Sequence, residues 1–314
     1  MTNNSSVGGA YLQRQINGQV IIVQLLVVIF LYINLLLIVT FFSKDFFYTT
    51  MRYILFAVTL LSDSLILIIS DIMLILSYFR FTMQIGMCVI MSIFVVLYTF
   101  VTPVTLTAMT LERFVAICMP LQHAELCSTR SALQCVLIIH SLSSIPCIFI
   151  HSFFFASATH RFYTHDKICS AEMFILRSWH GHFRSAISQS YFVIMCITIV
   201  FSYVKIMKVA KAASGENKKS TWKGLRTVIL HAFQLLLCLI QLWCPFIESA
   251  VLQIDLMLFI NIRYFNYITF YLAPRCLSPL IYGLRDEMFF HALKYYALCG
   301  LYKRQSSDLS CLTN

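Results

Sequence analysis

The chain has 314 residues, of which 60% are hydrophobic and only 11% are charged. A typical soluble domain is about half apolar and a quarter charged, so this composition excludes a water-soluble globule and indicates an outer face that meets lipid. The net charge of +10 does not indicate nucleic-acid binding, because the basic residues occupy short segments between apolar stretches and there report membrane topology.

The chain begins with a polar segment, Met1–Asn17, and its first apolar stretch begins near Val20. This stretch is long enough to span a bilayer and too long for the apolar core of a cleavable signal. We therefore expect residues 1–19 to form an extracellular N-terminus and the first helix to serve as the signal anchor.

Seven stretches are apolar over a length that crosses a bilayer as a helix. Membrane-spanning strands would instead show segments of about ten alternating residues. We predict an all-α membrane protein with a seven-helix transmembrane bundle at residues 20–284, with spans near Val20–Phe42, Met51–Tyr78, Gly86–Cys118, Ser131–Ala156, Ala186–Met207, Thr221–Phe246 and Leu258–Gly283.

The segment Arg285–Leu298 is amphipathic rather than uniformly apolar. Its apolar side chains recur at helical spacing, which predicts a helix lying in the membrane interface, and residues 299–314 then form a cytoplasmic tail. The recurring side chains are Met288, Phe289, Leu293 and Tyr296.

Lysine and arginine set the expected orientation. With the N-terminus outside, the cytoplasmic segments hold roughly twice as many basic residues as the outer ones, as the positive-inside rule requires. Two overlapping sequons, at Asn3 and Asn4, require a lumenal N-terminus in order to be glycosylated. We expect a multi-pass plasma-membrane protein with an extracellular N-terminus.

The 12 cysteines sort by this topology. Most lie within spans or on the cytoplasmic side, where thiols stay reduced. Only Cys88, at the outer start of the third span, and Cys169, in the long loop after the fourth, lie clearly outside. They allow one disulfide, and two free thiols are the alternative.

The strongest motif lies at the inner end of the third span, where Glu112 and Arg113 stand together within the string AMTLERFVAICMPL of residues 108–121. Two adjacent charges there are costly unless they pair or reach the head groups. The string resembles the Asp/Glu-Arg-Tyr switch of rhodopsin-like G protein-coupled receptors and its longer odorant-receptor form. Its continuation, residues 122–127, is similar to the fish odorant receptors.

Further motifs of that family follow in order on the expected spans, and the resemblance covers about 260 residues. They are Asn34 in the first span, Asp63 in the second, Tyr203 in the fifth, Lys223, Thr227 and His231 in the sixth, and Ser278, Pro279 and Tyr282 in the seventh.

The chain departs from the family pattern in several places, including the long outer loop, which has one cysteine and therefore lacks the second loop disulfide of mammalian odorant receptors. Phe114 replaces the usual tyrosine, and Ser278 replaces the asparagine of the Asn-Pro-x-x-Tyr element. The sixth span lacks the usual Trp-x-Pro bend, and Pro245 is expected to bend it about a turn and a half further out.

The resemblance implies a two-state receptor without enzymatic activity or cofactor. The Glu112–Arg113 pair would help hold the inner ends of the third and sixth spans together, and Tyr203 and Tyr282 would stabilise the released groups after activation. The implied partners are a small-molecule odorant, membrane lipid and a heterotrimeric G protein of the stimulatory type that raises cAMP, and no nucleic acid.

The resemblance also places a ligand pocket in the outer half of the bundle. No carboxylate lies near Val95, which disfavours classical amine ligands, and we expect a mostly apolar pocket with a few hydroxyls. Helical counting gives the candidate residues Val95, Val96, Thr99, Phe100, Ile187, Ser188, Tyr191, Leu242, Phe246, Tyr267 and Tyr271.

Other functions remain as alternatives. A rhodopsin-like receptor for a non-odorant ligand would share every motif above, whereas a transporter or channel would show paired repeats and broken helices. The outer loop contains His160, His165, His180 and His182, of which the last two could hold a metal, but such residues are more often solvated and we expect no metal site.

Arg275 is the one basic residue well inside a span, which makes it a functional candidate by default. It shares a helix face with Pro279 and Tyr282, which the resemblance implies looks inward. Asp63 lies at a similar depth on the second span, which the resemblance makes a neighbour of the seventh. We predict that Arg275 pairs with Asp63, taking the place of the sodium ion that many rhodopsin-like receptors hold there. The alternative is that its guanidinium turns along its own helix to a backbone carbonyl or water.

Overall fold

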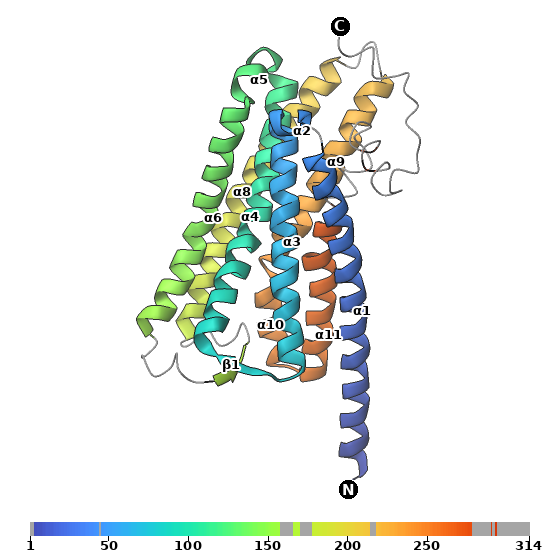
Figure 1. Ribbon diagram of the computed structural model, residues 1–314, viewed down its shortest axis with the longest axis vertical. Coiled ribbons are helices and arrows are strands. Elements are labelled where there is room, and N and C mark those ends of the chain that lie inside the picture. The colour runs from blue at the N-terminus through green and yellow to red at the C-terminus, as the bar shows by residue number, and fades with distance from the viewer. Residues whose placement is uncertain are drawn as a thin grey trace.

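The computed structural model describes residues 3–43, 45–157, 166–169, 178–213, 218–277, 290 and 293. For residues 3–13, 124, 178, 180, 210–213, 218–228 and 231 it describes the backbone alone. Long helices run side by side along the longest axis of the molecule (Figure 1). The described chain is an all-helical bundle, as predicted, with one small pair of strands at one end.

Six helical segments are long and apolar enough to cross a membrane. They correspond to the first six predicted spans, and the second has the predicted bounds, whereas the first helix begins earlier than the polar N-terminal sequence suggested. These segments belong to α1 (Asn3–Phe42), α3 (Met51–Tyr78), α4 (Ile85–Cys118), α6 (Thr129–Ser157), α8 (Ser178–Ala213), and α9 (Lys218–Gln241) together with α10 (Cys244–Leu252).

The sixth span is interrupted where the sequence predicted a bend. Helix α9 ends at Gln241, two turn residues follow, and α10 begins at Cys244 with Pro245 in its first turn. Proline has no N–H to donate and its ring clashes with the preceding turn. The break changes the direction in which side chains beyond Leu242 point.

The seventh predicted span is helical but irregular. Helix α11 (Leu256–Asn266) leads into a π-helix, η2 (Tyr267–Leu272), and α-helical turns then continue to Leu277. Asp255 caps the start of α11, where its Oδ2 accepts a 2.8 Å hydrogen bond from the N–H of Leu258. Of the predicted interfacial helix only Phe290 and Leu293 are described, so this helix stays a prediction.

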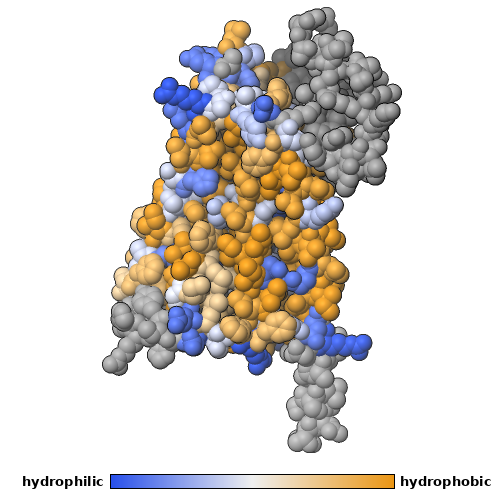
Figure 2. Space-filling view, viewed as in Figure 1, coloured by the Kyte–Doolittle hydropathy of each residue, from blue (hydrophilic) through white to orange (hydrophobic). Residues whose placement is uncertain are grey.

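The outer surface of the bundle is apolar across its middle. Figure 2 shows hydrophobic side chains over most of this zone, with hydrophilic ones gathered toward the two ends. Leu137 on α6, Ile194 and Ile197 on α8, and Val28 on α1 are each more than 60% exposed. Such exposure is unfavourable in water and ordinary against lipid.

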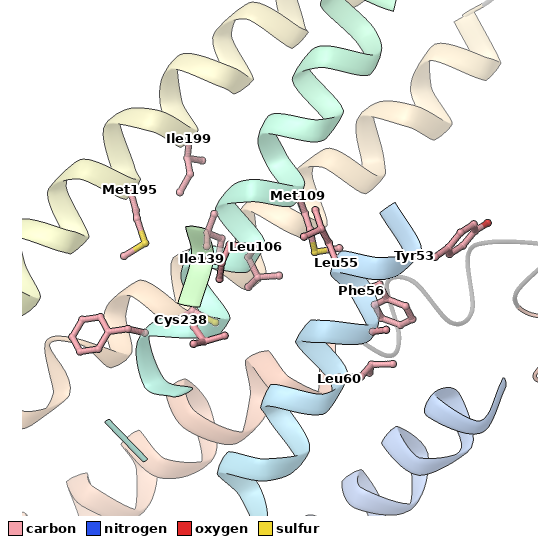
Figure 3. Packing of buried hydrophobic residues seen from close by; sticks show 14 of the residues in the cluster. Tyr53, Leu55, Phe56, Leu60, Leu106, Met109, Ile139, Met195, Ile199 and Cys238 are labelled. Atoms are coloured by element: carbon pink, nitrogen blue, oxygen red, sulfur yellow. The ribbon is translucent and has the colours of Figure 1, made fainter. Parts of the chain in front are cut away.

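Helix α4 lies at the centre of the bundle and contacts α3, α6, α8 and α9. Its Leu106 is fully buried in the main core cluster, which also contains Leu55 of α3, Ile139 of α6 and Ile199 of α8. Figure 3 shows these side chains, which extend from different helices into the core. The core therefore fixes the helices around α4.

Threonines are frequent along α4, although a lipid-embedded helix has no water to satisfy a hydroxyl. Each of four donates back to the carbonyl four residues earlier, at distances of 2.7 to 3.0 Å, which removes the cost of burying it. They are Thr99, Thr105, Thr107 and Thr110.

One end of the bundle is closed by a disulfide and a strand pair. Strand β1 (Thr82–Gln84) pairs antiparallel with β2 (Asp166–Ile168), and Cys169, directly after β2, is bonded to Cys88 with a Cα–Cα distance of 5.6 Å. The predicted disulfide is confirmed. We call this the disulfide end, and the opposite end, which carries Arg113, the Arg113 end.

Candidate functional site

A cavity of about 280 Å³ lies among the helices in the half of the bundle toward the disulfide end. This volume is close to the lower limit of typical small-ligand sites. Helices α4, α8, α9, α10, α11 and η2 all contribute side chains to it. Of the predicted pocket residues, those that line it are Val95, Val96, Thr99, Phe100, Ser188, Leu242, Tyr267 and Tyr271.

Three predicted pocket residues, Ile187, Tyr191 and Phe246, are not among the lining residues. The hydroxyl of Tyr191 donates a 2.7 Å hydrogen bond to the carbonyl of Leu142 on α6, which holds this side chain at the α6–α8 interface. Its ring contacts Phe100 edge to face, with centroids 5.3 Å apart. Phe246 lies beyond the break in the sixth span, and counting helical turns across that break does not predict which side chains face the cavity.

The cavity is more polar than the sequence indicated. Besides Ser92, its lining includes five polar or charged side chains that helical counting did not find: Arg184, Gln241, Glu248, Arg263 and Asn266. Arg184 and Glu248 each lie two residues outside a predicted span, and Arg263 lies five residues inside one. A position near the end of a span is the signal that the sequence offered for these residues. The cavity surface is nonetheless mostly apolar, as expected, and what the sequence missed is that its polar part includes charged and amide groups besides hydroxyls.

Glu248 on α10 supplies the carboxylate that was not found near Val95. Its Oε1 accepts a 3.1 Å hydrogen bond from Nδ2 of Asn266, and its Oε2 lies 3.9 Å from Nε of Arg263. Both partners lie on α11. This network ties α10 to α11 at the polar side of the cavity.

Arg275 lies beneath the cavity, toward the Arg113 end, and is almost completely buried. Its Nε lies 3.7 Å from Oδ1 of Asp63, so the predicted ion pair is present without a direct hydrogen bond. Its Nη1 donates to the carbonyl of Tyr271, one turn earlier. The guanidinium thus makes both the predicted contact and the alternative backbone contact.

The same guanidinium touches residues of the cavity. Its Nη1 donates to Oε1 of Gln241 at 3.4 Å, and its Cζ lies 4.0 Å from the centre of the Tyr271 ring. Tyr271 stacks on Tyr267, with centroids 4.9 Å apart and an interplanar angle of 15°. Both tyrosines lie on η2, so the π-helix positions the cavity wall and the arginine contact together.

Asp63 connects this group to the central helix. Its Oδ1 accepts a 2.9 Å hydrogen bond from the hydroxyl of Thr102 on α4. Nearby, Nε2 of the buried Gln234 on α9 donates a 3.1 Å hydrogen bond to the carbonyl of Pro274. A polar core therefore joins α3, α4, α9 and the seventh span.

The buried Asn34 on α1 donates to the hydroxyl of Ser64 on α3 at 3.3 Å. This residue therefore anchors the first helix to the second span. Ser64 directly follows Asp63 on α3, and Asn34 is not among the residues that line the cavity, so Asn34 borders the polar core instead.

At the opposite end, Glu112 has two basic side chains as neighbours. Its Oε2 lies 3.6 Å from Nε of Arg113 and its Oε1 lies 3.4 Å from Nε2 of His123. His123 belongs to α5 (Pro120–Leu126), a short helix that returns over the end of α4 after Met119. The sequence indicated the Glu112–Arg113 pair but not the contact with His123, because the return of α5 over α4 has no periodic pattern in the sequence.

Several predicted switch and modification residues lie outside the described side chains. Tyr203 is partly buried against the core. For the others the structure gives only a helical backbone or no description, so their roles stay predictions: Asn3, Asn4, Lys223, Thr227, His231, Ser278, Pro279 and Tyr282.

Comparison with known proteins agrees with this geometry. A family model described as the seven-transmembrane receptor of the rhodopsin family matches residues 33–282. Odorant receptor 131-2 of Danio rerio is 44% identical over 301 residues, which cover 96% of this chain and 92% of that protein.

Proposed function

Because the chain belongs to the rhodopsin family of seven-transmembrane receptors, a family of receptors rather than enzymes, we propose that it is an odorant receptor. It binds a small organic ligand between its helices and activates a heterotrimeric G protein of the stimulatory, olfactory type, which raises cAMP. The observation that carries this proposal is the cavity among α4, α8, α10 and η2, in a chain 44% identical to a fish odorant receptor.

The cavity is placed so that a ligand can act on the polar core. Gln241 and Tyr271 line the cavity and also contact Arg275, which pairs with Asp63. A ligand shifts a two-state equilibrium only if it binds one state more tightly. A ligand that moves Gln241 or the Tyr271 ring changes the surroundings of Arg275, which gives the two states different energies.

The Arg113 end is the proposed G protein side. Arg113 is held by Glu112 in this structure, at the end of the central helix α4. On activation the pair opens and Arg113 turns toward the G protein, as the family implies. The disulfide at the other end requires an oxidising compartment, which supports an extracellular disulfide end, an extracellular N-terminus and a cytoplasmic Arg113 end.

A transporter or channel fits less well. Such proteins bind their substrates at helices broken near the membrane midplane and at the junction of two repeats. Here the seventh span changes to a π-helix and continues to Leu277 without unwinding, and the family model that matches residues 33–282 is that of receptors. A receptor for a non-odorant ligand is the second candidate, and tissue of expression separates it from the first.

The test is a screen of small organic ligands on cells that express the chain with a cAMP reporter. Cells with empty vector serve as the control, and a calcium reporter run in parallel identifies coupling to other G proteins. We expect at least one volatile or water-soluble organic compound to raise cAMP in a saturable manner. Correct surface delivery without a response in either reporter would contradict the proposal.

A further inference from the structure

We propose that the preferred ligand is a neutral carbonyl compound, a small ketone, aldehyde or ester, whose oxygen accepts a hydrogen bond from the side-chain amide of Gln241. This inference rests on the proposed receptor function and deepens it by assigning the chemical class of the ligand. Gln241 is the last residue of α9, lines the cavity and is only partly buried.

The contact with Arg275 determines which half of the Gln241 amide is left for a ligand. Arginine can only donate hydrogen bonds, so the amide atom that faces its Nη1 at 3.4 Å is the oxygen, Oε1. The guanidinium is itself held in place, because its Nε lies 3.7 Å from Oδ1 of Asp63 and its Nη1 also donates to the carbonyl of Tyr271. The amide nitrogen, Nε2, therefore remains as the half that can donate to another group.

This nitrogen has no partner in the part of the chain that the structure describes. Nε2 of Gln241 makes no hydrogen bond to any described residue, and it is not enclosed by protein either, since Gln241 keeps accessible surface in the cavity. An N–H donor that leaves water without an acceptor costs free energy. A ligand that fills the cavity and displaces its water must therefore bring an acceptor to Gln241.

A carbonyl oxygen suits this donor better than the other polar groups of small organic molecules. It offers two lone pairs to the two N–H groups of the amide and carries no hydrogen that needs an acceptor. An alcohol or amine brings such a hydrogen, but Oε1 of Gln241 is already engaged by Arg275. A negative charge on the ligand is not required, because Asp63 already pairs with Arg275.

The surroundings of Gln241 suit an apolar or aromatic body. Leu242 follows it in the chain and lines the cavity, as does Phe100. The Tyr271 ring also lines the cavity and lies 4.0 Å from Cζ of Arg275, the same guanidinium that Gln241 contacts. The volume of about 280 Å³ limits the body to a short chain or a single ring.

The test compares ligands of one shape that differ at the polar atom. The purified full-length receptor in lipid nanodiscs is titrated calorimetrically with propiophenone, with the alkene in which a methylene group replaces its oxygen, and with the alcohol formed by its reduction. Methyl pentyl ketone and its two counterparts form a second series, and empty nanodiscs give the background. We expect the ketone of at least one series to bind about tenfold more tightly than its alkene and its alcohol, which corresponds to about 1.4 kcal/mol.

Two results in the wild-type receptor overturn the assignment. One is an alkene or alcohol that binds as tightly as its ketone in both series. The other is the absence of binding in both series.

Substitutions of Gln241 test the contact itself. Gln241→Glu keeps an oxygen for Arg275 and removes both N–H groups, so the ketone should lose its advantage of about tenfold while the alkene binds as before. Gln241→Met, of similar size and without either polar group, should do the same. Gln253→Glu is the matched control: Gln253 lies at the end of α10, is exposed and does not line the cavity. A ketone advantage that persists in either folded variant contradicts the contact.

Failure of this inference and failure of the proposed function give different results. A receptor that activates a G protein only with alcohols, amines or acids keeps its function and loses the carbonyl assignment. A chain that binds the ketone through Gln241 but never stimulates nucleotide exchange on any G protein keeps the site and loses the receptor function.

Discussion

Arg275 Nε lies 3.7 Å from Asp63 Oδ1, and neither side chain is more than 1% exposed to solvent. A charge in the membrane interior is costly unless a partner neutralises it. The pair joins the seventh span to α3, and the Thr102 hydroxyl on the same Asp63 oxygen extends the contact to α4. This group forms a polar core beneath the cavity.

Breaking this pair should destabilise the receptor. Arg275→Leu and Asp63→Leu should each cost about 3–5 kcal/mol, because each leaves one buried charge without its partner. The measurement is thermal denaturation of the purified receptor together with its surface expression. Arg130→Leu, on an exposed residue near the start of α6, is the control and should change neither.

The double variant Arg275→Leu with Asp63→Leu should be milder than the sum of the two single changes, since it leaves no unpaired charge. The same denaturation measurement gives the coupling energy. Strict additivity of the three values would show that the two residues do not act as a pair.

Removing the Glu112 carboxylate should raise basal signalling. Glu112→Gln deletes the ion pair with Arg113 at 3.6 Å, and because Arg113 is partly exposed, the pair contributes only ~0.2–1 kcal/mol, or up to about a fivefold change in population. Basal cAMP at matched surface expression is the readout. Glu125→Gln, on an exposed residue of α5, is the control, and an unchanged basal level in Glu112→Gln would count against the switch.

Loss of the disulfide should reduce folding. Cys88→Ser, Cys169→Ser and the double variant should be destabilised alike, by about 2–4 kcal/mol, because each removes the same bond. Surface expression and thermal stability are the measurements, with Cys196→Ser on a free thiol of α8 as the control. A double variant clearly worse than either single variant would mean that the two cysteines have separate roles.

Filling the cavity should weaken ligand binding. Val96→Phe adds volume to a lining position and should lower the potency of any agonist by about tenfold or more, at a stability cost of ~1–3 kcal/mol. Dose–response curves at matched surface levels test this. Val193→Phe makes the same change on the exposed face of α8, and equal potency losses in both variants would remove the cavity as the binding site.

The sequence predicted what depends on apolarity and depth. The α3 bounds followed from a continuous apolar stretch, and the Cys88–Cys169 bond followed from the position of two cysteines on one side of the membrane. The Arg275–Asp63 contact followed from similar depth on two spans that the family resemblance makes neighbours. In each case a lipid environment restricts the outcome to few arrangements.

Features that depend on local backbone geometry were not predictable in this way. The break before Cys244 brought Glu248, rather than Phe246, to the cavity. The π-helix at Tyr267–Leu272 adds a residue to each turn, which periodicity of 3.6 cannot represent. The contact of His123 with Glu112 arises from the chain reversal at Met119, which leaves no repeating pattern in the sequence.

The most direct test of the central claim compares binding and activation on the same purified receptor. Agonist affinity and G protein nucleotide exchange are measured in nanodiscs for the wild type and for Arg113→Ala, whose altered residue lies at the end of α4 away from the cavity. The variant should bind the agonist with unchanged affinity and should no longer stimulate exchange. Wild-type exchange in Arg113→Ala, at the same agonist occupancy, would contradict it.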